Sequence, residues 1–168
     1  MSIATEVAAS LRSSGTTLAL AESITGGLVA SRLTDVPGAS AFLLLGVVAY
    51  DGAAKCNVLG VSDRTMREQG AVSAETALEM AEGVRRLAGA DLGASCTGIA
   101  GPTGATTDKP LGLTYLACVG NGYERVERMV FEGSRVQVKE QACDCLMRMV
   151  KEAAEVHAGQ GCHKGIGE

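Results

Sequence analysis

The sequence predicts an α/β protein, a three-layer α/β/α sandwich around a mixed, mostly parallel sheet of about five strands. Two observations lead to this prediction. Short apolar runs alternate with longer segments whose apolar residues have helical spacing. One pair of strand-like runs is separated only by Gly120-Asn121-Gly122, which is typical of a hairpin and makes at least one strand antiparallel.

The first sixty residues alternate between helix and strand. Residues 1–12 have the apolar spacing of a surface helix. A short apolar strand over residues 17–21 leads through a tight turn into a helix that ends at Pro37-Gly38. Residues 42–50 are expected to form a second strand, too apolar for either face to meet water, and residues 52–60 a short helical turn.

Two further helices are expected over residues 62–70 and 73–88. Ser73 is a good N-cap for the second helix, and Gly89 lies just past its end. The buried stripe of this helix is expected to consist of Ala77, Met80, Ala81, Val84 and Leu87.

The remaining strands and the last helix follow the same logic. Residues 92–97 form a third strand, and residues 111–119 and 124–131 form the two arms of the hairpin. The last helix begins with a capping box at Ser134 and runs to about residue 157.

Length and charge restrict the classes of protein. A chain of 168 residues fits one domain, expected over residues 1–158, with a glycine-rich flexible tail over residues 159–168. The net charge of -4 argues against broad nucleic-acid binding but allows a local cationic pocket for one small anion. No apolar run approaches the roughly 18 residues of a membrane span, and residues 1–12 do not read as a signal peptide. We expect a cytoplasmic protein without nucleic-acid or membrane partners.

The six cysteines are expected to be reduced thiols, because none has CxxC spacing. Four of them lie in apolar segments, where cysteine packs as a small hydrophobe. Cys162-His163 is the only pair that hints at a metal, and we expect neither a metal nor another cofactor.

A serine stands where α/β proteins bind ligands. Ser23 follows a predicted strand and precedes a predicted helix, and ligands lie at the carboxyl ends of strands in open α/β sheets. Backbone N–H groups of the turn up to Gly27 are expected to be unpaired and to suit an oxyanion or a phosphate. The alternative is that Ser23 or Thr25 only caps the helix, and the segment alone does not decide between these readings.

A serine nucleophile needs a base, and Lys55 is the candidate. The sequence has no GxSxG motif, and its two histidines both lie near the C-terminus, which disfavours a Ser-His-Asp triad. Lysine is a base only when neutral, and burial beside the second strand would lower the pKa of Lys55 toward that state. The alternative is an ordinary exposed lysine.

Two further features lie at the ends of predicted elements. Thr97 and Gly98 begin a glycine-rich loop, where a hydroxyl and close backbone approach would serve a ligand. Arg135 lies in the first turn of the last helix, where the helix dipole disfavours a positive charge. An arginine at this position is therefore expected to bind an anion. The alternatives are an ordinary loop and a solvated arginine.

An ordered series of motifs resembles the CinA C-terminal family, the stand-alone nicotinamide-nucleotide amidases. The resemblance extends from about Thr16 to Val150. The matching segments are residues 21–27, 34–40, 46–50, Lys55 with 59–61, 70–73, 97–102, 109–112 and 131–135.

The resemblance implies a three-layer α/β/α fold and a metal-free hydrolysis of nicotinamide mononucleotide to nicotinate mononucleotide and ammonia. By position, Ser23 is the nucleophile, Lys55 the general base and Tyr50 a nearby phenol that relays a proton. The partner is a small pyridine nucleotide, and we expect a homo-oligomer. The residues expected to contact the substrate are Glu22, Thr25, Gly26, Gly27, Thr97, Gly98 and Arg135.

The sequence departs from the family pattern in three places. Ile24 replaces a usual cysteine, Ser134 replaces a common aspartate beside Arg135, and Asp51-Gly52-Ala53 replaces a Ser-Asn-Glu run. The last change alters the charge next to the base. Two other function classes stay open: a nucleotide-binding relative without turnover, and a scaffolding protein without nucleotide affinity. Release of ammonia from the mononucleotide would separate them.

Overall fold

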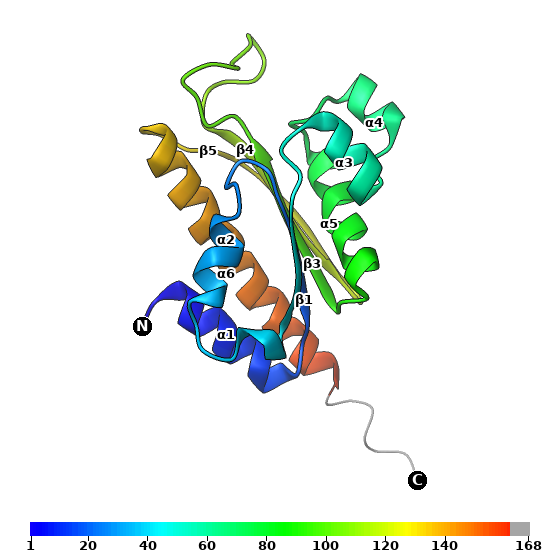
Figure 1. Cartoon of the computed structure of the whole chain (residues 1–168), viewed down its shortest axis with the longest axis vertical. Helices are drawn as coiled ribbons and strands as arrows, with labels where there is room; N and C mark the ends of the chain where they lie inside the picture. Colours follow the sequence, from blue (N-terminus) through cyan, green and yellow to red (C-terminus); the bar gives the residue numbers. More distant parts are fainter. Residues whose placement is uncertain (162–168) are drawn as a thin grey trace.

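A five-stranded sheet forms the middle layer of the computed structural model, which describes residues 1–161 (Figure 1). The strand order is β2-β1-β3-β4-β5. β1 pairs in parallel with β2 and β3, whereas β4 is antiparallel to both β3 and β5, so only β4 runs against the other strands. The strands are β1 (Leu18–Glu22), β2 (Leu43–Val48), β3 (Leu92–Gly98), β4 (Leu113–Gly120) and β5 (Tyr123–Val130).

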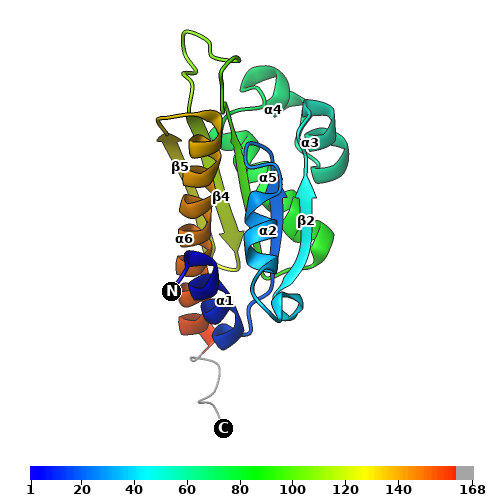
Figure 2. The same ribbon diagram turned by 60° about the vertical axis from the view of Figure 1, so that its left-hand side comes forward.

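Helices cover both faces of the sheet, which confirms the predicted three-layer sandwich (Figure 2). One face packs against α1 (Ile3–Ser14), α2 (Leu28–Thr34) and α6 (Arg135–Gly161), and this side holds the larger core cluster. The other face packs against α3 (Gly52–Leu59) and α5 (Ala74–Ala88), and α4 (Asp63–Glu68) lies beside these helices. The 3-10 turn η1 (Ala39–Ala41) precedes β2.

Local signals set the ends of the helices as predicted. Ser73 caps α5 by accepting a hydrogen bond from the N–H of Thr76 at 3.1 Å, and Gly89 ends this helix with positive φ. At the start of α6, the N–H of Ser134 donates to Gln137 Oε1 at 2.8 Å, which confirms the capping box. The hairpin between β4 and β5 is also confirmed, with Gly120 paired to Tyr123.

Three expectations about burial and length are wrong. β2 is an edge strand whose alternate side chains are exposed, with Leu44 at 48% and Val48 at 52%, because the short α2 covers only part of that face. Leu87 is 54% exposed, since Ala88 packs on the core at the end of α5 instead. α6 continues to Gly161, past the predicted end at residue 157, and the rest of the predicted tail lies outside the described residues.

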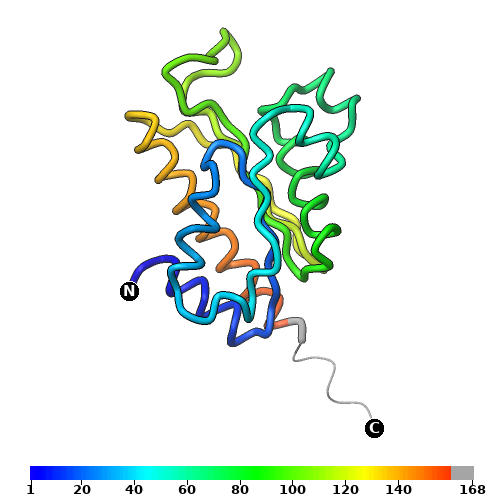
Figure 3. Tube along the Cα trace, in the orientation of Figure 1, coloured from blue at the N-terminus to red at the C-terminus, as the bar shows by residue number. Residues whose placement is uncertain are grey.

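No helix within residues 1–161 is both long and apolar enough to cross a membrane. Figure 3 shows the loop between β3 and β4 standing beyond the end of the sheet, next to the end where β1, β2 and β3 finish.

Candidate active site

The carboxyl ends of β1, β2 and β3 lie side by side, with β1 between the other two. The chain leaves β1 through α2 on one face of the sheet and returns from β2 to β3 through α3, α4 and α5 on the other face. This reversal creates a switch point beside β1, where α/β sheets form their ligand crevices. The residues that follow these three strands build the site.

Ser23 is held rigidly between the two neighbouring strands. Its N–H donates to the carbonyl of Cys96 in β3 at 3.0 Å, and the carbonyl just before it, on Glu22, accepts from the N–H of Ala49 at 2.9 Å. Ser23 is 7% exposed. The hydroxyl therefore has a fixed backbone beneath it, as a nucleophile requires.

Lys55 reaches this hydroxyl from the first turn of α3. Its Nζ lies 2.9 Å from Ser23 Oγ, 2.9 Å from the carbonyl oxygen of Ala49 and 3.3 Å from that of Tyr50. The residue is only 2% exposed. A neutral amine has two N–H groups and one lone pair, so it can donate to both carbonyls and accept the proton of Ser23.

Burial lowers the pKa of Lys55 below its ordinary value, because the charged form loses its hydration. The negative charges of Asp51, and of the Cys96 and Cys56 thiolates when ionised, act in the opposite direction and are weaker. Asp51 is one of the positions that depart from the family pattern. Burial therefore favours the neutral amine that a base must be, and Asp51 counteracts part of this effect.

A pocket of about 250 Å³ opens over this pair and is also lined by Tyr50, Thr97, Gly98 and Arg135. Thr97 is buried, and its hydroxyl donates to the carbonyl of Ala71 at 2.7 Å. The structure thus brings together six of the ten predicted site residues.

Arg135 and Tyr50 meet at the mouth of the pocket. Arg135 Nη1 donates to the carbonyl of Gly101 at 2.7 Å, and Nη2 donates to the hydroxyl of Tyr50. Tyr50 is 60% exposed, so its phenol lies on the rim. The phenol of Tyr50 therefore contacts Arg135, and the hydrogen bond between Tyr50 and Lys55 involves the backbone carbonyl of Tyr50.

Most N–H groups around the turn after Ser23 are already bonded, which corrects the expectation that they are unpaired: the N–H of Gly26, for example, donates to the carbonyl of Ser23 at 3.1 Å. The buried carboxylate of Glu22 turns back and accepts hydrogen bonds from the N–H groups of Gly27, Val29 and Ala30 at 3.0, 3.1 and 2.8 Å. It also accepts from the hydroxyl of Thr25 at 2.6 Å. A carboxylate at a helix N-terminus is stabilised by the helix dipole, so Glu22 serves as an internal cap of α2.

Four predicted substrate contacts therefore have structural roles and do not line the pocket: Glu22, Thr25, Gly26 and Gly27. The two glycines adopt φ of 63° and 95°, which other residues rarely tolerate. Gly98 lines the pocket, but packing also requires a glycine there. A Cβ at this position would lie 2.6 Å from the carbonyl oxygen of Leu113.

The sequence analysis did not predict a structural role for Lys109, whose side chain connects two walls of the pocket. Its Nζ donates to the carbonyls of Gln69 and Val72 at 2.7 and 2.8 Å. Ala71 and Val72 line the pocket, as do residues of the loop to which Lys109 belongs. Residues 70–73 and 109–112 both belong to the motifs that resemble the family, but nothing in their spacing along the chain shows that they are in contact.

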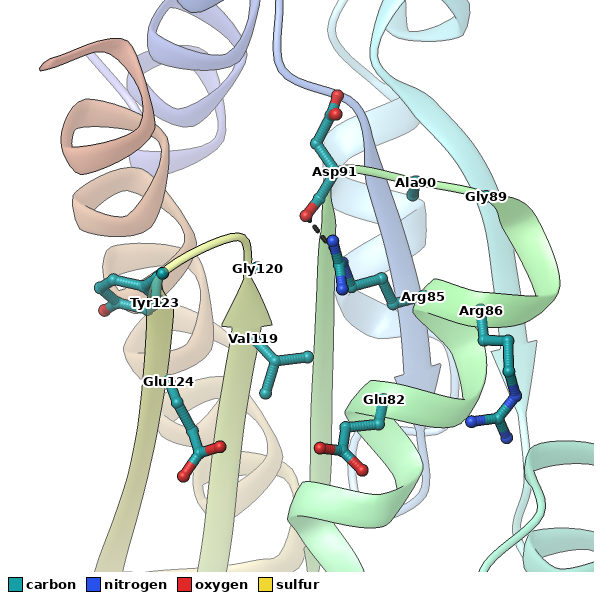
Figure 4. A pocket seen from close by; sticks show the side chains of 11 residues that line it. Glu82, Arg85, Arg86, Gly89, Ala90, Asp91, Val119, Gly120, Tyr123 and Glu124 are labelled. Atoms are coloured by element: carbon teal, nitrogen blue, oxygen red, sulfur yellow. Dashed lines mark hydrogen bonds between the residues drawn. The ribbon is translucent and has the colours of Figure 1, made fainter. Parts of the chain in front are cut away.

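A larger hollow of about 920 Å³ lies at the opposite end of the sheet, between the end of α5 and the hairpin turn (Figure 4). Its charged side chains have mixed signs, and Arg85 is bonded to the carbonyl of Asp91 at 2.9 Å. Its lining residues include no serine, cysteine or lysine. The smaller pocket, which contains Ser23 and Lys55, is therefore the candidate site.

Metal ligands do not gather anywhere in residues 1–161, where no group of three or more His, Cys, Asp and Glu side chains could hold an ion. The cysteines of this part of the chain are free thiols, with Cys96, Cys118 and Cys143 buried. Cys162-His163 lies outside the described residues.

Comparisons with solved structures show the same fold. A competence-damaged protein (CinA) superfamily protein from Klebsiella pneumoniae matches with a TM-score of 0.88 and 36% identity, over 92% of this chain and 96% of that one. A competence/damage inducible protein from Agrobacterium tumefaciens matches with a TM-score of 0.88 and 35% identity, over 91% and 93% of the two chains.

Curated relatives are longer proteins. A CinA-like protein from Geotalea uraniireducens is 48% identical over 137 residues, which are 82% of this chain and 33% of the relative. One from Citrifermentans bemidjiense is 53% identical over 133 residues, 79% of this chain and 32% of the relative. The chain thus spans about a third of the length of the curated relatives it matches. The model of the CinA C-terminal domain matches residues 1–154. With this match and these relatives, the chain belongs to the CinA C-terminal domain family.

Proposed function

We propose that this chain is an amidohydrolase that converts nicotinamide mononucleotide to nicotinate mononucleotide and ammonia, with Ser23 as nucleophile and Lys55 as base. The single observation that carries the proposal is the buried contact of 2.9 Å between Lys55 Nζ and Ser23 Oγ. The choice of substrate rests on the motifs of the family and on the cationic mouth of the pocket.

The reaction would proceed through an ester on Ser23. Neutral Lys55 takes the hydroxyl proton while Ser23 Oγ attacks the carboxamide carbon and forms a tetrahedral intermediate. The intermediate expels the amine, which takes the proton from the Lys55 ammonium and leaves as ammonia. Lys55 then deprotonates a water, which attacks the ester, and the carbonyl–Oγ bond breaks with return of the proton to Ser23.

The shape and charge of the pocket suit the two ends of such a substrate. A volume of about 250 Å³ is small for a whole nucleotide, because ligand pockets commonly measure about 300–1,000 Å³. We infer that the carboxamide ring enters the pocket while the phosphate stays at the mouth near Arg135. In this arrangement Tyr50 orients Arg135, and its side chain has no step in proton transfer.

A test of the mechanism measures ammonia release from nicotinamide mononucleotide. Ser23→Ala should abolish release, because it removes the attacking oxygen, and should leave the circular dichroism spectrum and the thermal midpoint unchanged. Lys55→Arg should be equally inactive, since a guanidinium keeps the charge but is not a base near neutral pH. Ser13→Ala, on the exposed side of α1, is the matched control and should keep full activity.

Near-normal release from Ser23→Ala would show that the serine mechanism is wrong. Substantial release from Lys55→Arg would leave Lys55 only an electrostatic role. An observation that favours a second candidate is Asp51, whose charge raises the pKa of the base. That candidate, a nucleotide-binding relative without turnover, would bind the mononucleotide and release no ammonia from the wild-type protein.

A further inference from the structure

Two cations lie one turn apart near the start of α6, next to the catalytic pocket and the turn after Ser23. Arg135 lines the mouth, and Lys139 is half-buried beside the turn that follows Ser23. Lys139 Nζ lies 3.6 Å from the point where a Cβ on Gly26 would stand, and the trace in Figure 3 brings this turn next to the start of α6. Residues four apart on a helix are neighbours, so the two charges face the same space.

Neither cation has an acidic partner. Within residues 1–161, every ion pair of 4.0 Å or less joins other side chains. Like charges four residues apart destabilise a helix, and Arg135 also opposes the dipole at the start of α6. The recorded partners of Arg135, the carbonyl of Gly101 and the hydroxyl of Tyr50, are neutral and do not compensate its charge, whereas an anion between the two cations would stabilise both.

An anion at this mouth cannot use the N-terminus of α2. The carboxylate of Glu22 already accepts hydrogen bonds from the N–H groups of Gly27, Val29 and Ala30. It would also repel a second anion placed there. Side-chain cations are therefore the better donors for an anion here, and Arg135 lines the mouth while Lys139 lies beside the turn.

We propose, resting on the function proposed above, that Lys139 and Arg135 together form a subsite for a phosphomonoester dianion at the mouth of the pocket. A phosphomonoester carries a charge of about -1.5 to -2 at neutral pH, which matches two cations. Lys139 would then determine specificity for the nucleotide over the nucleoside, while Ser23 and Lys55 act on the carboxamide. Its role is in binding and not in bond breaking.

Titration calorimetry of the Ser23→Ala protein, which cannot turn over, tests the subsite with two ligands at fixed salt. Adding Lys139→Met should weaken the binding of nicotinamide mononucleotide about tenfold or more and leave the affinity for nicotinamide riboside unchanged, because only the mononucleotide has the phosphate. Lys139→Arg should keep most of the affinity. Lys151→Met removes a lysine paired with Glu155 at the far end of α6, and it should not change the affinity for either ligand.

Inorganic phosphate separates this proposal from the proposed function. In ³¹P line-broadening titrations, the wild-type protein should bind phosphate, the Lys139→Met protein should bind it about tenfold more weakly, and the Lys151→Met protein should match wild type. Binding that depends on Lys139 supports the subsite, even if the mononucleotide is neither bound nor hydrolysed and the proposed function fails. Phosphate binding unchanged by Lys139→Met, or an equal loss of mononucleotide and riboside, would overturn the subsite while leaving the amidase proposal intact.

Discussion

Two buried ionisable side chains at the end of β1 and β2 are stabilised in different ways. The carboxylate of Glu22 has four hydrogen-bond donors around it, three of them from the backbone of α2 and its approach. Lys55 has only carbonyls and one hydroxyl as partners, and burial lowers its pKa. A buried charge needs compensating groups. Hydrogen bonds therefore compensate the burial of Glu22, whereas burial disfavours a charged Lys55.

Glu22 should be among the most sensitive positions for stability. Glu22→Ala leaves three backbone N–H groups without their acceptor, at about 1–3 kcal/mol each, so the free energy of unfolding should fall by at least about 3 kcal/mol. Urea unfolding followed by circular dichroism measures this change. Glu68→Ala, which breaks an exposed pair with Arg64, is the control and should cost less than about 1 kcal/mol. Equal losses in the two variants would contradict the internal cap.

The pKa of Lys55 predicts the direction of a pH effect on stability. Between its lowered folded pKa and the ordinary value of 10.5, the unfolded chain holds a proton that the folded chain has lost. The free energy of unfolding should therefore rise with pH across this window because of Lys55. Lys55→Met lacks this titration, so urea unfolding over a pH series should give a steeper rise for the wild type. Parallel curves would show that Lys55 titrates normally.

At the level of elements, the pocket depends on contacts between loops as well as on strand ends. The loop from β3 to β4 and the segment before α5 are joined by Lys109, whose ammonium bonds two carbonyls of that segment. The β3–β4 loop stands beyond the sheet and packs on little else (Figure 3). Few buried contacts make such a segment prone to local opening.

Removal of this tie should loosen the pocket wall and spare the sheet. Lys109→Met should speed amide hydrogen exchange about tenfold in residues 69–73 and 104–112, because hydrogen bonds from a charged donor contribute about 1.5–3 kcal/mol. Exchange in β1 and β3 should not change. Lys151→Met is the matched control at the other end of the molecule. Exchange that stays at the wild-type rate in both segments would show that the loop is held by other contacts.

For the whole molecule, the two edges of the sheet differ in chemistry. β5 carries Glu124, Arg125, Glu127 and Arg128, and such charges discourage pairing with another sheet. β2 has the sequence LLLGVV with no charge, and Leu44 and Val48 are half exposed. An uncharged apolar edge is compatible with the same edge of a second copy, as a two-fold interface requires. If copies of this chain associate, we expect their interface to lie along β2.

A lysine on either edge tests this expectation. Leu44→Lys on β2 should shift the molar mass from light scattering toward the monomer, because each copy would bring a charge into the shared interface. Val130→Lys on β5 is equally exposed and should leave the mass unchanged. A wild-type protein that is monomeric at high concentration, or an equal effect of both variants, would show that β2 is not the interface.

Features that depend on neighbours along the chain follow from the amino-acid sequence alone. Helical spacing, N-caps at Ser73 and Ser134, and the Asn-Gly turn specified the layers and the hairpin, since each is a local preference of backbone and side chain. The motifs also pointed to Ser23, which directly follows β1, and to Lys55, which lies in the helix after β2, and a parallel sheet places these two strand ends side by side.

The directions of side chains and the contacts between distant segments depend on the three-dimensional packing. Glu22 turns inward to cap α2, Lys109 ties two loops together, and Lys139 lies over the turn at Gly26. β2 lies at the edge of the sheet, so its apolar face is half exposed despite a sequence typical of a buried strand. Periodicity reports the face on which a residue lies, but not the element that covers that face. That depends on the packing of segments far apart in the chain.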